Sequence, residues 1–523
     1  MQINRNSVLY NASVMTFAGF LLQIIGFIYR IYLSRMAGPE GLGIYRLILP
    51  VHSVSISLAI SGVRMAATSL SAEMNLKRDK MAVRMLTRIC ILIFLGIFVC
   101  MALPVITFRE GIGLHVLGDA RTGPALPIMM ACILLTGFEL ILESIFLGLK
   151  KTKFTAVSNV LEQLTQMGAV IWLLSALRTE DCGLTATLIC VAMVISEVPV
   201  VTWLGISYKR VVLAAAQENP NPTPEKCSLL ARVRNIAIPV TFSGVATTLL
   251  SSAGTVLLPQ RLMVAGLSDK EAIGQLGIIS GMALPLLTFP SLFLNALSTV
   301  LVPTISHSIS CGNRQDTKRK IRKAIQAVSL IGLPAMGVLL PLAPDLSVLL
   351  YDQTLSKKYL ALLAVSVIFL YYQNITISIL NGLELQKQAM INVITGEGVE
   401  LCLIYLLAAL PQLHIYGYIA GTISCGVLIT FFNLRLIRKR TGVKIGIKKT
   451  VAMPLLAAGI LGLFSNMIYR SLASRADQIL AIVSTILLCI LIYFILLLIM
   501  GIRPIRYFKG VLVQTPSKPQ IES

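Results

Sequence analysis

The sequence predicts an all-α polytopic membrane protein with about fourteen transmembrane helices. Hydrophobic residues make up 56% of its 523 residues and charged residues only 13%, whereas an average soluble domain is roughly 25% charged. Residues 91–103, 455–467 and 479–500 contain no charged side chain, and about 20 such residues cross a bilayer. A soluble core of this length could not bury so much apolar surface.

Each expected span is an apolar segment between polar ones. The spans are 7–33, 43–70, 88–109, 124–149, 156–178, 184–208, 235–262, 276–308, 324–350, 358–383, 389–411, 415–436, 450–471 and 479–501. With the N-terminus inside, Lys and Arg are about three times as numerous in the inside segments as in the outside ones, the bias that orients membrane proteins. We therefore expect a plasma-membrane protein with both termini in the cytoplasm.

The net charge of +22 does not predict nucleic-acid binding, because Lys and Arg occur in short runs between apolar segments, where they contact membrane lipids. The ten Cys and four His form no CxxC motif and no spacing typical of a metal site. We expect no bound cofactor. We also find no phosphate loop, HExxH motif or paired-Asp motif, and so expect a transporter rather than an enzyme.

The two halves of the chain resemble each other at an offset of about 230 residues. Four short motifs recur in the same order: 15–19 as 240–244, 35–38 as 263–266, 60–63 as 297–300, and 145–149 as 379–383. The offset covers six spans, so both halves enter the membrane in the same direction, as in transporters whose two bundles rock about a central cavity. The expected divisions are an N-terminal six-helix bundle (1–208), a cytoplasmic linker (209–234), a C-terminal six-helix bundle (235–436), and two further helices with a cytoplasmic tail (437–523).

Arginine within a span is costly, by roughly 2.5–3.5 kcal/mol on insertion scales, and so marks a functional site. On the second span, polar residues recur every three or four positions and share one helix face. The predicted substrate-binding residues, which line a cavity for phosphate, are Arg30, Arg46, Arg64, Ser53, Ser57 and Ser61. The guanidinium fork suits phosphate, but the helix rise puts Arg46 and Arg64 about 27 Å apart, too far to grip one phosphate.

Simpler roles for these arginines stay open. Arg30 and Arg46 lie near span ends and can snorkel to the interface. Arg64 can pair with a carboxylate such as Glu139, or end its span early. However, the second-half counterpart of Arg64 is Leu301, so the anion-attracting feature is confined to the first half.

Carboxylates also lie within the expected spans, where burial lets such groups titrate near neutral pH and bind H⁺ or Na⁺. The candidate ion-coupling residues are Glu139, Glu143, Glu162, Glu397 and Glu400. A further carboxylate, Glu197, lies in the sixth span. Pairing with nearby lysines or with the cavity arginines is the alternative role.

Three segments near the N-terminus are distinctive: 26–30 (GFIYR), 35–43 (RMAGPEGLG) and 45–47 (YRL). They resemble the multidrug/oligosaccharidyl-lipid/polysaccharide flippase superfamily. Within the superfamily, the chain is most similar to the sporulation branch of the polysaccharide biosynthesis flippases, which are related to the lipid II flippases. The resemblance covers nearly the whole chain, including its arrangement of six, six and two helices.

The resemblance implies export of a polyprenyl-pyrophosphate-linked glycan, a peptidoglycan precursor for the spore cortex or cell wall. It also implies a V-shaped pair of bundles whose cationic cavity holds the pyrophosphate. Arg30, Arg46 and Arg64 are cations of the matching kind on the first two helices, and Arg261 lies near the outer end of the seventh. We expect a monomer, since nothing in the sequence demands more.

Two competing functions are weighed against this one. A multidrug/organic-cation antiporter of the same superfamily would need an acidic, aromatic-lined cavity, which Arg residues oppose but Glu139, Glu143 and Glu162 favour. A membrane enzyme acting on the same lipids would need a carboxylate or His constellation on a sizeable outer loop, and the outer loops are short.

Overall fold

The computed structural model describes residues 5–77, 79–177, 179–213, 226–446, 448–474 and 477–501. The Pro-rich part of the expected linker, 217–225, and the tail beyond residue 501 lie outside these ranges. Every regular element in the described ranges is a helix, which confirms the predicted all-α class. The helices form two compact units, one made of residues up to 281 with 404–415, the other of residues 282–403 with those from 416 onward.

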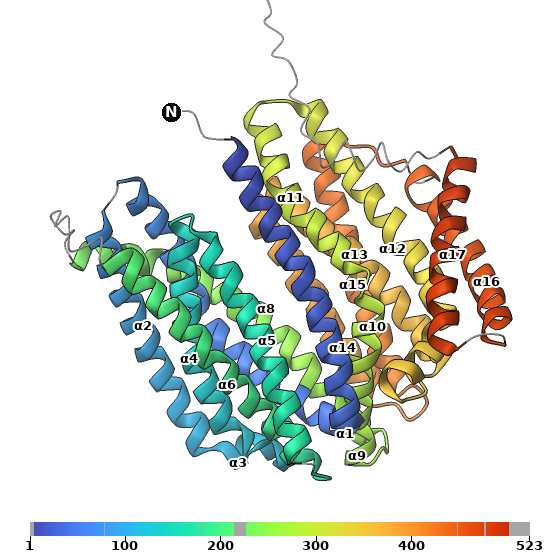
Figure 1. Ribbon diagram of the computed structural model, residues 1–523, viewed down its shortest axis with the longest axis horizontal. Coiled ribbons are helices and arrows are strands. Elements are labelled where there is room, and N and C mark those ends of the chain that lie inside the picture. Colours follow the sequence, from blue (N-terminus) through green and yellow to red (C-terminus); the bar gives the residue numbers. More distant parts are fainter. Residues whose placement is uncertain are drawn as a thin grey trace, which may run out of the picture. The chain divides into compact units, whose positions relative to one another are not determined.

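Within its described residues, the first unit contains eight α-helices and three short irregular helices. They are α1 (Arg5–Leu76), α2 (Lys80–Thr107), α3 (Arg109–Gly111), η1 (Ile112–Leu117), η2 (Ala120–Thr122), α4 (Ala125–Gly148), α5 (Thr152–Ala176), α6 (Cys182–Tyr208), η3 (Lys209–Leu213), α8 (Lys226–Val264) and α9 (Asp269–Leu276). Figure 1 shows α4 running beside both α2 and α6.

The boundary between the units falls within η4 (Gly277–Ala283), whose last two residues belong to the second unit. Its helices are α10 (Leu284–Thr288), α11 (Ser291–Ser310), α12 (Arg314–Tyr351), α13 (Lys357–Gly382), α14 (Gln386–Leu407, which ends in the first unit), α15 (Ile415–Thr441), η5 (Lys448–Ala452), α16 (Met453–Ala473) and α17 (Gln478–Ile499). α12 packs against α13 and α16, and α16 against α17 (Figure 1).

Twelve helices in the described ranges are long and apolar enough to cross a membrane. One of them, 21–76, is two helices that meet at Gly38, where φ is 66°. That backbone conformation favours glycine, and Pro39, which has no amide hydrogen to lose, begins the next helix. α5 is not among the twelve because Glu162 and its polar neighbours make it less apolar. The merging of the first two expected spans and the exclusion of α5 explain why twelve helices are found where fourteen spans were expected.

The second helix of α1 forms the centre of the first unit's core. Its buried side chains, among them Ile60 and Val63, pack with Leu86 of α2, Ile141 of α4 and Val233 of α8. Each of these side chains is no more than 2% exposed. The core therefore depends on how closely α1 can approach its neighbours.

Two glycines of α1 bring its backbone into contact with other helices of the unit. A Cβ on Gly62 would overlap the carbonyl oxygen of Ala237 in α8, and one on Gly43 would overlap that of Ile273 in α9. Small residues at membrane helix interfaces allow backbones to approach in this way. Contacts this close leave no room for a side chain.

Helices α4 and α13, which the predicted repeat pairs, end in the same way. α4 ends at Gly148, which packs against Thr68 of α1, and α13 ends at Gly382, which packs against Val302 of α11. Two residues later, Lys150 has φ 58° and Glu384 has φ 60°. In both turns the next amide closes onto a carbonyl five residues back: Lys151 N donates to Phe146 O, and Leu385 N to Leu380 O, each at 2.9 Å.

We predict that Gly62→Ala destabilises the protein, because the added methyl group forces α8 away from α1. Overpacking of a close contact costs about 1–3 kcal/mol. The midpoint of thermal unfolding of the purified protein in detergent should fall. Gly96→Ala is the matched control, because no atom lies within 4 Å of that Cβ. An equal midpoint for the two variants would contradict the predicted contact.

Candidate substrate and ion-coupling site

Arg64 forms an ion pair inside the first unit. Its Nη2 lies 2.9 Å from Oε2 of Glu143, on α4. The Arg64 side chain is 43% exposed, whereas that of Glu143 is 9% exposed. The carboxylate is thus covered by protein, while the Arg64 side chain is only partly covered. The sequence left open whether Arg64 pairs with a carboxylate or ends its span early. In the structure it pairs with a carboxylate, and the partner is Glu143 rather than Glu139.

Further carboxylates surround this pair. Glu139 lies one turn before Glu143 on α4 and is 4% exposed. It is within electrostatic range of Glu197 on α6, Glu162 on α5 and Glu143. Thr136 Oγ1 donates a 2.6 Å hydrogen bond to Glu197. Three helices thus bring four carboxyl groups together beside a single described arginine.

Glu197 was not among the predicted ion-coupling residues. On its own helix, no polar residue lies three or four positions before or after Glu197, so the sequence marks no polar face there. Ser196 is polar but adjacent to it. Its place follows from the packing of α6 on α4 and α5. The signal in the sequence was only that a carboxylate occurs in the middle of an apolar segment.

The serines of the predicted stripe have different surroundings. Ser57 is buried and Ser53 exposed. Ser61 Oγ donates a 2.5 Å hydrogen bond to the carbonyl oxygen of Ser57, one turn earlier. A Cβ on Gly244 of α8 would lie 3.2 Å from Ser57 Oγ and 3.3 Å from Ser61 Oγ. Ser57 and Ser61 therefore lie against α8 in this conformation.

Arg30 and Arg46 lie near the other end of the stripe. Arg30 is exposed and Arg46 is half-buried. Both are within electrostatic range of Tyr29, which is 7% exposed. The structure brings these two arginines, one on each side of Gly38, to one tyrosine, and Arg46 lies about 27 Å of helix rise from Arg64.

An ionic network beside the α1 kink was missed from the sequence. Arg121 in η2 lies 2.7 Å from Glu40 and 2.8 Å from Asp119, and Lys270 of α9 lies 3.6 Å from Glu40. The hydrogen bonds to Asp119 raise the pKa of Arg121 above its usual range. Because Glu40 follows the turn at Gly38, the network ties this turn to α9.

Arg261, near the end of α8, makes a hydrogen bond and a cation–π contact with Tyr405. Its Nε donates a 3.0 Å hydrogen bond to the carbonyl oxygen of Tyr405, and its guanidinium lies 4.0 Å from the centre of that ring. Both contacts are within the first unit. They are stabilising by hydrogen bonding and cation–π attraction.

The predicted carboxylates of the second half lie on α14. Glu397 and Glu400 are both half-buried and within electrostatic range of each other. Glu400 is hydrogen-bonded to Cys425 of α15. No described cation pairs with either carboxylate. The two candidate ion sites thus differ, since only the first includes an arginine.

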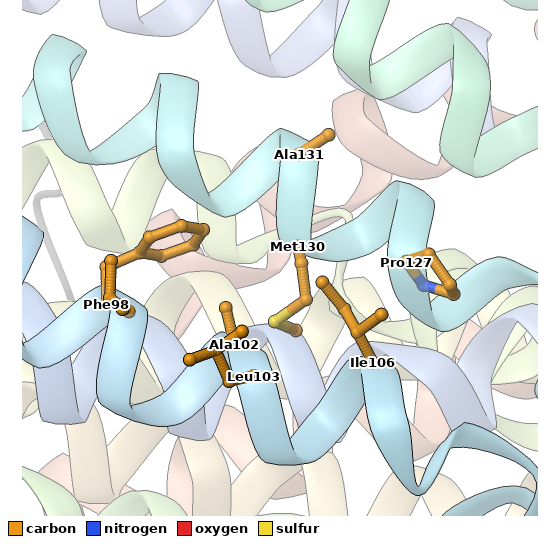
Figure 2. Close-up of a pocket in the computed structure, with 8 residues that line it drawn as sticks. Phe98, Ala102, Leu103, Ile106, Pro127, Met130 and Ala131 are labelled. Carbon is orange, nitrogen blue, oxygen red and sulfur yellow. The ribbon is translucent and has the colours of Figure 1, made fainter.

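An apolar groove runs between α2 and α4, with a volume of about 320 Å³. Figure 2 shows side chains from both helices around it. Its lining residues are Phe98, Val99, Ala102, Leu103, Ile106, Pro127, Met130 and Ala131. The groove is suited to hydrocarbon and offers no polar group to an ion. The described residues also contain no group of three His, Cys, Asp or Glu side chains that could hold a metal ion.

Comparison with known proteins identifies the family of the chain. Residues 8–309 match the model of the family described as polysaccharide biosynthesis protein, and residues 278–488 match that of lipid II flippase MurJ. Stage V sporulation protein B of Bacillus subtilis (strain 168) is 24% identical over 95% of this chain and 96% of its own length. Lipid II flippase MurJ of the same organism is 24% identical over 87% of each chain.

Two solved structures have the same fold. The inward closed conformation of lipid II flippase MurJ has a TM-score of 0.67 at 13% identity, covering 93% of this chain and 98% of that one. An inward-facing multidrug resistance MATE family transporter also has a TM-score of 0.67, at 14% identity, covering 82% and 98%. The protein is thus a multi-pass membrane protein with the transporter fold of the multidrug/oligosaccharidyl-lipid/polysaccharide superfamily, and it belongs to the polysaccharide biosynthesis protein family.

Proposed function

We propose that this protein is a flippase that moves a lipid-linked oligosaccharide from the inner to the outer leaflet by alternating access, without changing it chemically. The observation that carries the proposal is the half-exposed side chain of Arg64 inside a membrane span. A cation in that place is costly unless it serves a ligand or a partner. The names of the relatives, a lipid II flippase and a sporulation protein, support a peptidoglycan precursor of the spore cortex or cell wall as the substrate.

The polyprenyl pyrophosphate linkage accounts for the need for arginine. A pyrophosphate diester carries negative charge in the membrane at every pH of interest, and a guanidinium binds it through two parallel hydrogen bonds. Arg64 supplies this group on the first unit. Arg46, about 27 Å from Arg64 along the helix, and Arg30, on the helix before Gly38, would meet the substrate at a different stage of its passage.

The serines and carboxylates take supporting roles in this proposal. Ser57 and Ser61 lie against Gly244 and would contact the substrate once α8 moves away, whereas Ser53 is exposed already. The carboxylates are candidate sites for H⁺ or Na⁺: Glu139, Glu143 and Glu162 in the first unit, Glu397 and Glu400 in the second. We further propose that the halves before and after the linker 209–234 act as the two moving bundles of a monomer.

The acidic cluster favours one second candidate, export of organic cations. Glu139, Glu162 and Glu197 are the kind of groups that would attract a cationic drug. Likeness to a multidrug transporter supports the fold alone at 14% identity. Arg64, in contact with the same cluster, opposes a cation, so we favour the anionic substrate.

We predict that Arg64→Ala abolishes flipping while the protein still inserts and folds. The measurement is the leaflet accessibility of a fluorescent lipid-linked precursor in reconstituted vesicles. Loss of the charge-assisted hydrogen bonds alone costs about 1.5–3 kcal/mol, or roughly ten- to a hundredfold in affinity. Arg64→Lys should restore only part of the rate, because Lys lacks the planar fork.

Arg88→Ala is the matched control for Arg64→Ala, since Arg88 is an exposed arginine of α2. Full flipping by Arg64→Ala would contradict the proposed phosphate contact. A variant series that changes resistance to cationic dyes and leaves lipid flipping untouched would favour the organic-cation antiporter instead.

We also predict that both termini face the cytoplasm, from the distribution of Lys and Arg. Green fluorescent protein fused to either end should fluoresce in cells, and alkaline phosphatase at the same positions should be inactive. Fusions after residue 120, in the segment between α2 and α4, should give the opposite result. The same activity at residue 120 and at the termini would refute the orientation.

A further inference from the structure

The Arg64 guanidinium has unused capacity. It has five N–H donors, and among the described residues it makes one hydrogen bond, to Glu143. With 43% of its side chain exposed, it can bind an outside anion by adding a partner or by exchanging one. Which of these happens depends on what Glu143 can tolerate.

Glu143, in contrast, has no spare partner: its other charged neighbours are carboxyl groups, so among the described residues only Arg64 compensates its charge. From α1 it faces Arg64, from its own helix Glu139, and from α5 Glu162. α6 adds Glu197, within range of Glu139 and Glu162. α2 packs against the same helix through an apolar contact of Phe94 with Gly137. Arg64 is thus the one positive charge that the described residues bring to this carboxylate.

Taking Arg64 away from Glu143 would leave a buried negative charge beside three other carboxyl groups. An unpaired buried charge is strongly destabilising, and more so in a membrane, where no water replaces the partner. The carboxylate can avoid this penalty by binding a proton. Once Glu143 is neutral, Arg64 has no ionic partner and its full charge is available to an anion.

We infer that an anion and a proton bind to this site together: the substrate pyrophosphate takes Arg64 from Glu143, and Glu143 takes up a proton from solution. When the anion leaves, Glu143 releases the proton and pairs with Arg64 again. In the empty protein, Glu143 therefore takes the place of the substrate anion and keeps the arginine neutralised. The inference rests on the proposed function only for the identity of the anion.

The test uses the purified full-length protein in nanodiscs and a soluble probe, citronellyl pyrophosphoryl N-acetylglucosamine. The charge of this pyrophosphate diester does not change between pH 5.5 and 8.5, so a pH-dependent affinity reports on the protein. Wild-type affinity should fall by up to about tenfold per pH unit above the titration of Glu143, as expected for one linked proton. Calorimetry in two buffers of different ionisation enthalpy should show one proton taken up per probe bound.

Glu143→Gln is the decisive variant, because its amide has the shape of the carboxyl group and cannot ionise. It should bind the probe with an affinity that is flat with pH, takes up no proton, and exceeds the wild-type affinity at pH 8.5. Glu143→Asp keeps a titrating carboxyl group and should retain the pH slope, which separates the linkage from a general loss of structure. Glu110→Gln, at a side chain that is 90% exposed, should behave as wild type.

The linkage is overturned if Glu143→Gln keeps the wild-type slope and proton uptake, or if the wild-type protein binds the probe without taking up a proton or does not bind it at any pH. Flipping of a labelled lipid-linked precursor, measured in parallel, tests the proposed function separately. Proton-linked binding without flipping would sink the proposed function and leave the linkage standing. Flipping together with proton-free binding of the probe would overturn the linkage and leave the proposed function standing.

Discussion

A charge inside a bilayer must have a partner, and this constraint organises the first unit. Each of the two charges is costly without the other where it lies, so the ion pair of Arg64 with Glu143 favours one register of α1 against α4. The same register brings α5 and α6, which pack against α4, into place with their carboxyl groups. A polar requirement thus positions the helices, and apolar side chains such as Ile60 and Ile141 fill the space between them.

Close packing by glycine is the complementary constraint. Gly62 and Gly43 let the backbone of α1 approach α8 and α9, and α8 in turn covers Ser57 and Ser61. In lipid, helices gain little from hydrophobic association, so such contacts and van der Waals packing hold them together. Along the polar stripe of α1, α8 therefore covers Ser57 and Ser61, whereas the side chain of Arg64 stays partly exposed.

The sequence predicted the all-helical class and the spans well, because both follow from apolar length. It assigned Arg64 and the serines to one helix face by their spacing, whereas Ser57 and Ser61 lie against α8 and Arg64 pairs with Glu143 of α4. It did not predict Glu143 as the partner of Arg64, nor the network of Glu40, Arg121 and Lys270. Pairing between helices depends on their relative rotation and register, which no local pattern encodes.

The turns after α4 and α13 share a left-handed residue that is not glycine. An L-residue in the left-handed conformation costs about 1–2 kcal/mol, and glycine would avoid that cost. Yet Lys150 and Glu384 both adopt it, with side chains of opposite charge. In both turns the amide that follows closes onto a carbonyl five residues back, so the hydrogen-bonded turn offsets the cost of the backbone angle. The turn thus depends on main-chain hydrogen bonding and tolerates side chains of either charge.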